Sequence, residues 1–499
     1  MKYITKDLYV AFNECPKKFF MMKEEKEEKW ELTSIIAKSD GEKVLKIAKE
    51  LFPSGKDVEG DTIEEKIENT KQLIKEGYET LFGAYFLVDG DCLVQIDIFT
   101  KKEDKVWEII EVKATSSSEM FDFVKSGSKK ASIKSQLNDL AYQSFCMKKL
   151  GLTIVPSLIN VNTRYKKMES LDLRKYLLKF TFEKQIKEFE IDVEDNIKKI
   201  KKVDEEPSVM VGSHCKNPYP CIFKNHCWDQ LPDDTIHKIP RISTSKRKLF
   251  SDNNIESISQ LKENDEMRNE LTDGQKAVIS GYLRGKIKKD IMKLTIFLNR
   301  IKYPIYYVDF ETFPPIVPKY ENSRPGENIP FQYSLHVEEK KGEFKHYEFL
   351  NTKNEDPRKE FIDSLIPKMG KEGSVIVYNR AFEEGVLDRL VELYPDHTES
   401  VQNIKNRVVD LWTPFKEGYY YDPKMLFSNS LKAVLPALAP HLNYNSLYIS
   451  HGEEAMFMYE KMINMEDGPE KDKIIQGLLE YCKLDTWAMV EILNVLRKK

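Results

Sequence analysis

The sequence predicts an α/β protein with two separate modules, and three observations lead to this fold class. The 499 residues exceed the length of one ordinary domain. β-rich runs alternate with helical stretches both before residue 235 and after residue 300, as α/β domains require. The segment between them contains no strand-like run. We therefore expect domains at 1–235 and 301–499, joined by a helical linker at 236–300.

Composition indicates a soluble chain. Charged residues make up 32% of the sequence, while 41% hydrophobic and 11% aromatic residues suffice for ordered cores. No apolar run approaches the roughly 20 residues that span a bilayer, and the first residues lack a secretory signal pattern. We therefore expect a cytoplasmic protein without a membrane partner. The net charge of −4 means that any nucleic-acid binding must use local basic patches.

The first module begins with helices and continues into strands. Residues 1 to about 80 have mostly helical patterns, including the apolar spacing of 41–51. Two β-rich runs, 93–98 and 106–112, are separated by the polar turn KKEDK and predict a hairpin. A helix is expected at 133–149.

The second module carries the pattern of buried strands between helices. Residues 305–310 (IYYVDF) and 374–378 (SVIVY) are apolar strand candidates separated by helical stretches. Near the end of the chain, YCKLDTWAM predicts a helix.

The hairpin carries a candidate metal site. Asp97 ends its first strand, and Glu111 and Lys113 lie on one face of its second strand because they are two residues apart. Two carboxylates can hold a divalent cation that polarises a phosphodiester, and the ammonium can orient water or stabilise developing charge. The alternative is an ordinary surface hairpin with an exposed Glu/Lys pair.

Four of the seven cysteines form a candidate cluster. Cys215, Cys221 and Cys227 follow a C-x5-C-x5-C spacing about 200 residues after Cys15. In a chain without a secretory signal, this pattern favours metal ligation over disulfides. Structural zinc is the rival, although its usual close cysteine pair is missing. The remaining cysteines have apolar settings and are expected to be buried thiols: Cys92, Cys146 and Cys482.

In the order of these motifs, residues 1–235 resemble RecB-like nucleases of the PD-(D/E)XK type that carry an AddB-like 4Fe-4S cluster. The resemblance implies a restriction-endonuclease-like fold. It also implies a structural cluster on the four thiolates, with one cysteine before the nuclease core and three after it.

Two positions depart from that family. Its early helix often has a histidine where this chain has Leu45, and Glu42 is the substitute ligand to weigh against a solvated surface role. Its later helix has a glutamine followed four residues on by tyrosine, whereas this chain has QLNDLAYQ; Gln136 or Gln143 can fill that role, and we prefer Gln143. A lysine-rich stretch just before this helix is a candidate phosphate contact: Lys125, Lys129, Lys130 and Lys134.

The second module carries separated acidic motifs. Asp309 and Glu311 are two residues apart on an apolar strand, and Tyr481 and Asp485 are four apart on a predicted helix, so each pair shares a face. Glu383 lies between them in Asn-Arg-Ala-Phe-Glu. Carboxylates from separate elements can hold two metal ions, while the phenol of Tyr481 orients the attacking water. Each motif alone is common by chance; the ordered set is not.

This ordered set resembles the DEDDy exonucleases of the RNase H-like fold, whose motifs are DxE, Asn-x-x-Phe-Asp and YxxxD. Glu383 stands where that family has aspartate and is one methylene longer. Asp388 and Asp410 are the alternative carboxylates nearby.

Nearly the whole chain resembles a bacterial family of uncharacterised proteins that fuses these two modules. We expect a nuclease hydrolysing DNA with Mg2+ or Mn2+, with a 3′-5′ exonuclease site in its second module, in repair or recombination. RNA is the alternative substrate. The rival functions are a nucleic-acid-binding scaffold with one or both sites inactive and a zinc-stapled interaction protein. The sequence predicts no particular protein partner.

Overall fold

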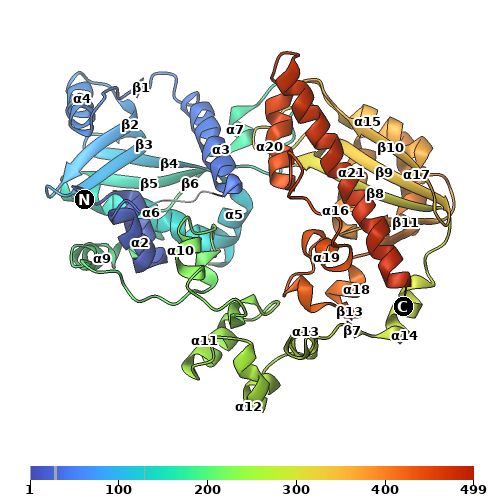
Figure 1. The fold of residues 1–499 in the computed structure, drawn as a ribbon. Coiled ribbons are helices and arrows are strands. Elements are labelled where there is room, and N and C mark those ends of the chain that lie inside the picture. The colour runs from blue at the N-terminus through green and yellow to red at the C-terminus, as the bar shows by residue number, and fades with distance from the viewer. Residues whose placement is uncertain (1, 27–30, 128–129, 499) are drawn as a thin grey trace. The chain divides into compact units, whose positions relative to one another are not determined.

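The computed structural model describes residues 2–26, 31–127 and 130–498 (Figure 1). The chain forms two compact units. The first consists of Met1–Gln230 and Pro315–Glu327, and the second of Leu231–Pro314 and Asn328–Lys499. The segment predicted as a linker, 236–300, therefore groups with the second unit.

The first unit is built on a six-stranded mixed sheet whose strands follow sequence order. β2, β3, and β4 are antiparallel neighbours, and β4 and β5 are parallel with helices α5 and α6 in the crossover. The strands are β1 (Lys56–Asp57), β2 (Thr80–Val88), β3 (Cys92–Glu103), β4 (Val106–Ser116), β5 (Thr153–Val161) and β6 (Leu177–Thr181).

Apolar cores cover both faces of this sheet. One core joins the sheet to α1, α6 and α9, and the other joins it to α3 through Val44 and Ala48. Thr5 begins α1 by accepting a hydrogen bond from the Leu8 amide, which satisfies a free helix N–H. The helices are α1 (Lys6–Glu14), α2 (Pro16–Lys23), α3 (Leu32–Lys49), α4 (Ile63–Lys75), α5 (Ser117–Ser126), α6 (Ala131–Lys149), α7 (Leu173–Tyr176), α8 (Ile186–Glu190), α9 (Val193–Ile200) and α10 (Lys224–Trp228).

The predicted hairpin is present as β3 and β4, but its strands are longer than expected. β3 continues through the polar residues KKE, so the turn is confined to Asp104 and Lys105, and β4 extends at its other end to Ser116. Asp97 consequently lies inside β3 and does not end it, which corrects the prediction. The helix expected at 133–149 is confirmed as α6.

The second unit is built on a five-stranded mixed sheet of order β10-β9-β8-β11-β12. β8, β9 and β10 are antiparallel, whereas β8, β11 and β12 are parallel. The strands predicted at 305–310 and 374–378 are confirmed as β8 and β11. The strands of the unit are β7 (Lys288–Lys289), β8 (Ile305–Phe313), β9 (Ile329–Lys340), β10 (Glu343–Leu350), β11 (Ser374–Val377), β12 (Val408–Asp410) and β13 (Tyr420–Tyr421).

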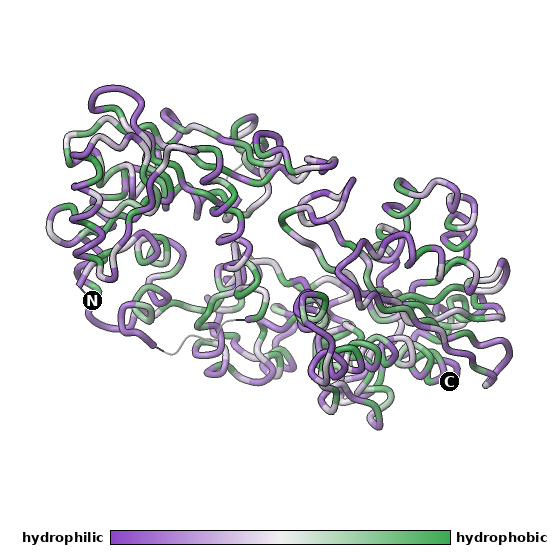
Figure 2. The backbone as a smooth tube through the Cα atoms, turned by 90° about the horizontal axis from the view of Figure 1, so that it is seen from above, coloured by the Kyte–Doolittle hydropathy of each residue, from purple (hydrophilic) through white to green (hydrophobic). Residues whose placement is uncertain are grey.

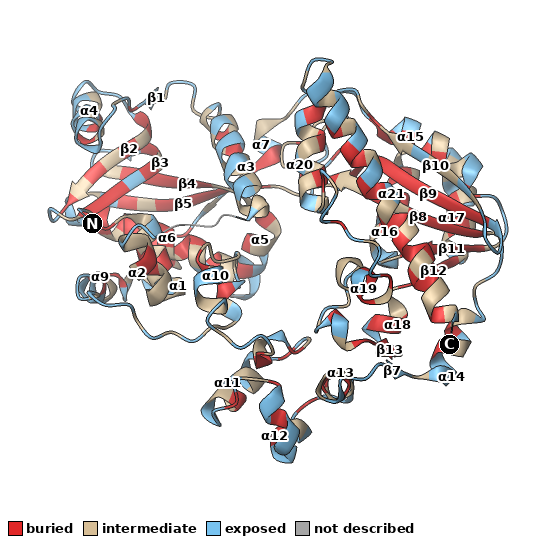
Figure 3. Ribbon diagram, viewed as in Figure 1, coloured by how far each residue is buried: buried red, intermediate tan, exposed pale blue. Residues whose placement is uncertain are grey.

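Helices cover both faces of this sheet, and Figure 3 shows its central strands as buried. One face packs on α15, α16 and α17, and the other on α14, α19 and α21. The helices are α11 (Thr244–Asp252), α12 (Asp265–Asn269), α13 (Asp273–Arg284), α14 (Ile291–Leu298), α15 (Arg358–Leu365), α16 (Arg380–Leu393), α17 (Thr398–Asn406), α18 (Thr413–Lys416), α19 (Leu431–Leu438), α20 (Gly452–Met462) and α21 (Pro469–Arg497).

The predicted α/β class is thus confirmed. Segment 236–300 is mainly helical as expected, with the correction that β7 within it pairs with β13 in a two-stranded sheet. Hydrophobic and hydrophilic stretches alternate along the backbone (Figure 2). Within the described ranges, every helix is too short or too polar to cross a bilayer.

Candidate functional sites

The first unit gathers three carboxylates, Asp97, Glu111 and Asp139, which we call the first carboxylate cluster. β3 supplies Asp97, β4 supplies Glu111 and α6 supplies Asp139. The amide of Val112 donates to Asp97 Oδ2 at 2.9 Å, which fixes that side chain between the two strands. Glu111 is 3% exposed and Asp139 5% exposed, so each needs a cationic partner.

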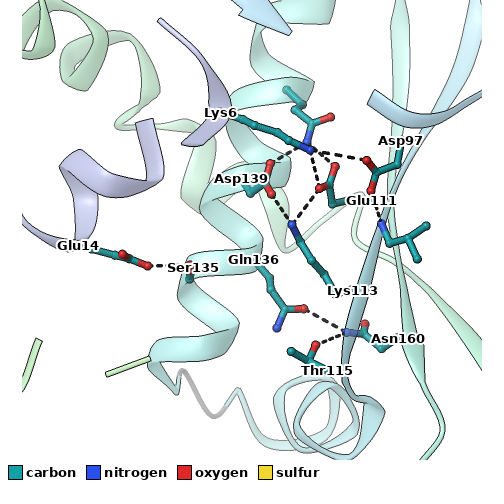
Figure 4. A network of polar contacts seen from close by, with 12 residues as sticks. Lys6, Glu14, Asp97, Glu111, Lys113, Thr115, Ser135, Gln136, Asp139 and Asn160 are labelled. Atoms are coloured by element: carbon teal, nitrogen blue, oxygen red, sulfur yellow. Dashed lines mark hydrogen bonds and ion pairs between the residues drawn. The ribbon is translucent and has the colours of Figure 1, made fainter. Parts of the chain in front are cut away.

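Two lysines provide that charge (Figure 4). Lys113 Nζ lies 2.9 Å from Glu111 Oε1 and 2.7 Å from Asp139 Oδ2. Lys6 Nζ lies 2.6 Å from Glu111 Oε1 and 3.9 Å from Asp97 Oδ1. The predicted set of Asp97, Glu111 and Lys113 is therefore assembled, with a second ammonium among its carboxylates.

The two carboxylates predicted from the sequence, Asp97 and Glu111, have pKa values shifted in opposite directions. Burial and the neighbouring Glu111 raise the pKa of Asp97 to about 6. Burial also disfavours the charged form of Glu111, but Lys113 and Lys6 outweigh it and hold the pKa of Glu111 below its ordinary value. Glu111 is thus the permanently charged member of the first carboxylate cluster.

The glutamine alternatives separate clearly. Gln143 Nε2 donates to Glu111 Oε2 at 2.9 Å and to Asp139 Oδ1 at 2.7 Å. Gln136 Oε1 instead accepts from Asn160 Nδ2 at 3.1 Å. Both family departures lie on α3: Glu42 is exposed, and Leu45 packs against the apolar core between α3 and the sheet. Gln143 is therefore the glutamine that contacts the first carboxylate cluster.

The lysine-rich stretch before α6 is solvated. Lys125 and Lys130 are exposed, and Lys130 pairs with Glu119 at 3.2 Å. Lys134 is also exposed, and Lys129 lies outside the described residues. None of the described lysines in this stretch contacts the first carboxylate cluster.

Sequence reasoning missed Lys6 and Asp139. Asp139 had a usable signal, because it lies one helical turn before Gln143 on α6. Lys6 had none in its own neighbourhood: it reaches Glu111 across 105 residues because α1 packs on α6, where the rings of Tyr9 and Tyr142 stack with centroids 5.1 Å apart.

All four cysteines of the predicted cluster line one pocket of the first unit. Cys15 sits between α1 and α2, and Cys215, Cys221 and Cys227 come from the chain around α10. None forms a disulfide. Four thiols converging from the two ends of a domain form a set suited to a soft metal or an iron-sulfur cluster.

His214 was not predicted and lies in the same pocket. Its Nε2 is 3.6 Å from Cys215 Sγ. Burial opposes ionisation of Cys15 and Cys215, but contact with His214 lowers the pKa of both thiols. Burial raises the pKa of Cys227 to about 11. The cysteines predicted as buried thiols are buried: Cys92, Cys146 and Cys482.

The second unit gathers the carboxylates of Asp309, Glu311, Glu383 and Asp485, which we call the second carboxylate cluster. β8 supplies the first two, α16 supplies Glu383 and α21 supplies Asp485. Oxygens of Asp309 and Glu311 lie within 4.8 Å of each other and of Cys482 Sγ, an arrangement that can hold a metal ion. Asp485, Glu311 and Glu383 all lie near enough to Asp309 for their charges to act on it, so the predicted acidic residues are brought together.

Burial is the main cause that opposes ionisation in this cluster. Burial raises the pKa of Asp309 well above its ordinary range, and the charges of Asp485, Glu311 and Glu383 raise it further. Burial raises the pKa of Glu383 to about 8 and that of Asp485 to about 6. Glu383 Oε2 is buried with no hydrogen-bond partner in the described protein. Such a set is poised to accept a cation.

Two tyrosines border the second carboxylate cluster. Tyr444, which the sequence did not indicate, donates from its hydroxyl to Asp485 Oδ1 at 2.6 Å. Tyr481 lies beside it with ring centroids 6.0 Å apart. Burial and the charges of Asp485 and Glu311 raise the pKa of Tyr481 far above its ordinary value, so its phenol stays protonated. Tyr481 can orient a water molecule but not deprotonate it.

A lysine faces these rings. Lys432 Nζ is 5.0 Å from the ring centre of Tyr481 and 5.3 Å from that of Tyr444, and it donates to the Ser450 carbonyl at 2.8 Å. Burial and the charge of Asp485 raise the pKa of Glu311 well above its ordinary range, and the charge of Lys432 only partly opposes this rise. Lys432 thus brings positive charge to two of the four carboxylates, Glu311 and Asp485.

The alternative carboxylates have other partners. Asp388 is exposed and pairs with Lys405 at 2.5 Å. Asp410 accepts from the amides of Asn379, Arg380 and Trp412 at 3.3, 3.3 and 2.9 Å, so it fixes the start of α16. Neither replaces Glu383 in the second carboxylate cluster.

Comparison with known proteins adds relationships of limited extent. The family model of a domain of unknown function, DUF2779, matches residues 306–430, which include Asp309, Glu311 and Glu383. The uncharacterized protein MG366 of Mycoplasma genitalium is 28% identical over 215 residues, covering 39% of this chain and 32% of that protein. The chain is thus similar to about a third of the length of this relative, and both similarities concern proteins described without an activity.

Proposed function

We propose that this chain is a nuclease with two metal-dependent sites that hydrolyse phosphodiester bonds of DNA. The convergence of the second carboxylate cluster carries the proposal: four acidic side chains from three elements, Glu383 and Asp485 buried and Asp309 and Glu311 partly buried, meet beside a protonated tyrosine. Burying like charges together costs free energy that a divalent cation offsets. Mg2+ or Mn2+ held there would polarise a phosphate and activate water.

The residues of each site have distinct roles in this proposal. In the second unit, Asp309, Glu311 and Asp485 would hold metal, Glu383 would complete the set, and Tyr481 would orient water for attack at a 3′ end. In the first unit, Asp97 and Glu111 would hold metal. Lys113 would stabilise charge on the phosphate while Gln143 orients Glu111.

The finer fold assignments belong to the same proposal. The first unit would be a restriction-endonuclease-like domain of the PD-(D/E)XK type, and the second an RNase H-like domain of the DEDDy type. Parallel pairing of β8 with β11 and of β11 with β12, beside the antiparallel β9 and β10, supports the latter. A role in DNA repair or recombination is part of the proposal.

The cysteine pocket would hold a 4Fe-4S cluster with a structural role. Its four thiols come from both ends of the first unit, so a shared cluster would join those ends. Anaerobic purification should give brown protein with absorbance near 400 nm and about four iron atoms per chain. Colourless protein with stoichiometric zinc would contradict this assignment.

The activity test uses 3′- and 5′-labelled DNA, single-stranded and duplex, with Mn2+; matching RNA tests the alternative substrate. Lys113→Ala should remove the first unit's products, and Asp309→Asn those of the second. Lys179→Ala is the control for the first, because Lys179 also pairs with a buried glutamate, Glu108, at 2.9 Å. Asp388→Asn is the control for the second.

The alternative is a nucleic-acid-binding scaffold. The ion pair between Lys6 and Glu111 favours it for the first unit, because an ammonium already neutralises the carboxylate that would hold metal. Binding of DNA without turnover by wild-type protein, in Mg2+ and in Mn2+, would establish the scaffold and overturn the nuclease proposal.

A further inference from the structure

A pocket of about 650 Å³ lies in the second unit between β10, α21 and segment 441–447. Four flat rings form a continuous row along it. The ring centroids of His336 and His346 are 4.3 Å apart, those of His336 and Trp487 5.3 Å, and those of Phe344 and Trp487 5.2 Å. The planes of neighbouring rings are tilted by 33°, 56° and 67°, so the rings line the pocket at different angles and each offers its own face or edge to a planar ligand.

Hydrogen bonds hold the two imidazoles in place. His336 Nδ1 lies 2.8 Å from Thr486 Oγ1, and His346 Nε2 lies 3.0 Å from Ser334 Oγ. Burial lowers the pKa of His336 to about 3 and that of His346 to about 4, so both rings are neutral near pH 7. The stacking surface is therefore preformed and uncharged.

Cationic groups line the same pocket. Lys345 and Lys483 are exposed beside the aromatic row, with Glu480 as the acidic residue among the lining side chains. An uncharged aromatic floor with ammonium groups at its border complements a planar ring attached to a phosphate. A nucleotide has this chemistry.

We propose that this pocket is a binding site for a base of single-stranded DNA, which stacks on Phe344 and contacts His346 and Trp487, with adjoining phosphates at Lys345 and Lys483. The inference rests on the proposed function, because it takes the nuclease substrate as the ligand. Sequence-tolerant stacking on aromatic side chains suits an enzyme that shortens any strand.

The pocket shares two elements with the second carboxylate cluster. On α21, Lys483, Leu484 and Trp487 line the pocket, while Tyr481 and Asp485 one turn apart face the carboxylates. Segment 441–447 lines the pocket and also supplies Tyr444, which bonds Asp485. A base in this pocket therefore occupies the side of α21 away from the carboxylates and anchors a strand whose end is processed elsewhere on the unit.

Binding in EDTA tests the site without hydrolysis. Fluorescence anisotropy of labelled oligo-dT of 12 nucleotides, with full-length wild-type protein, is compared with Phe344→Ala and with the double variant Lys345→Ala/Lys483→Ala. Each should weaken binding about tenfold, as expected for loss of one stacked base or of two phosphate contacts. Tyr448→Ala is the control, because Tyr448 is an exposed aromatic of the same unit outside the pocket.

If Phe344→Ala fails to fold, the double variant Lys345→Ala/Lys483→Ala still tests the pocket, because both lysine side chains are exposed. Oligo-rU and thymidine monophosphate show whether the pocket prefers DNA strands, RNA strands or free nucleotides, and preference for either of the last two overturns the proposal. Unchanged affinity in the double variant overturns it as well, while Mn2+-dependent cleavage by wild type would leave the nuclease proposal standing. Weakened binding with no cleavage by wild type would support the pocket and contradict the nuclease.

Discussion

At the scale of residues, the two carboxylate clusters solve the same electrostatic problem differently. In the first, Lys6 and Lys113 face three carboxylates at distances of 2.6 to 3.9 Å. In the second, burial opposes the ionisation of all four carboxyls, and the half-buried Lys432 lies near Glu311 and Asp485. We expect the second cluster to depend more strongly on a bound cation for its stability.

This contrast gives a pH prediction for Glu383. The folded chain keeps this carboxyl protonated up to a pKa of about 8, whereas an unfolded chain releases the proton near 4.5. The folded state therefore binds more protons between these values, and stability falls as pH rises from about 4.5 to 8. Thermal unfolding in EDTA should show this fall, Glu383→Gln should reduce it, and Mn2+ should oppose it.

The control is Asp388→Asn, an exposed carboxylate on the same helix. It should leave the pH dependence unchanged. Equal pH slopes for wild type and Glu383→Gln would show that Glu383 ionises normally in the folded chain.

Lys6 gives a second prediction. Lys6→Met removes an ammonium that competes with a cation for Glu111, so Mn2+ should bind the first unit several-fold more tightly. Calorimetric titration of Mn2+ in an Asp309→Asn background isolates this site, and Lys2→Met, at an exposed pair with Glu64, is the control. Weaker Mn2+ binding by Lys6→Met would mean that Lys6 orients the carboxylates and does not compete with the metal.

At the scale of elements, periodicity and strand patterns predicted the parts that are locally encoded. The hairpin, α6, β8 and β11 were all predicted, because apolar alternation and helical spacing are properties of neighbouring residues. These elements carry Asp97, Glu111, Gln143 and Asp309, so most proposed ligands were named from the sequence.

What the sequence did not show depends on packing between distant elements. Lys6 and Tyr444 reach carboxylates 105 and 41 residues away, and the surrounding residues of each have no motif. Asp97 was placed at a strand end because polar KKE was assigned to the turn, whereas pairing with β4 extends the strand through it. Strand pairing outweighs local polarity in β3, and packing between distant elements brings Lys6 and Tyr444 to their carboxylates.

The docking of α1 gives a prediction at this scale. Tyr9 is fully buried and stacks on Tyr142 of α6, so Tyr9→Ala removes the main contact that holds α1. We expect a loss of about 3–5 kcal/mol in the unfolding free energy of the first unit, by analogy with other large aromatic truncations. Denaturant unfolding measures it. The DNA cleavage products that Lys113→Ala removes should diminish, while those that Asp309→Asn removes should persist. A loss of unfolding free energy below about 1 kcal/mol would show that other contacts hold α1.

At the scale of the whole chain, sequence order and structural units do not coincide. The chain leaves the second unit after β8, contributes Pro315–Glu327 to the first unit, and returns at β9. Within the first unit, Ser323 accepts from the amide of Lys167 at 3.0 Å, and Ile316 accepts from the Tyr176 hydroxyl at 3.2 Å. A fragment ending near residue 230 therefore lacks part of the first unit.

Hydrogen exchange checks this consequence. The amide of Lys167 donates to the Ser323 carbonyl at 3.0 Å, and the amide of Asn322 donates to the Lys167 carbonyl at 2.7 Å. Both amides should therefore exchange slowly in the full chain. In a fragment of residues 1–230 the Lys167 amide should exchange rapidly, while amides inside β3 and β4 remain protected. Slow exchange of Lys167 in the fragment would contradict this assignment of the segment.

The position of α1 has one more consequence. This nine-residue helix, about 13 Å long, begins at Lys6 beside the first carboxylate cluster and is followed directly by Cys15 in the cysteine pocket. Its end is also tied to α6, where Ser135 donates to Glu14 at 2.9 Å. Oxidative damage that moves Cys15 away from the other three cysteines would therefore also move Lys6 away from Glu111, so the state of the cysteine pocket and the charge balance of the first carboxylate cluster change together through this one short helix.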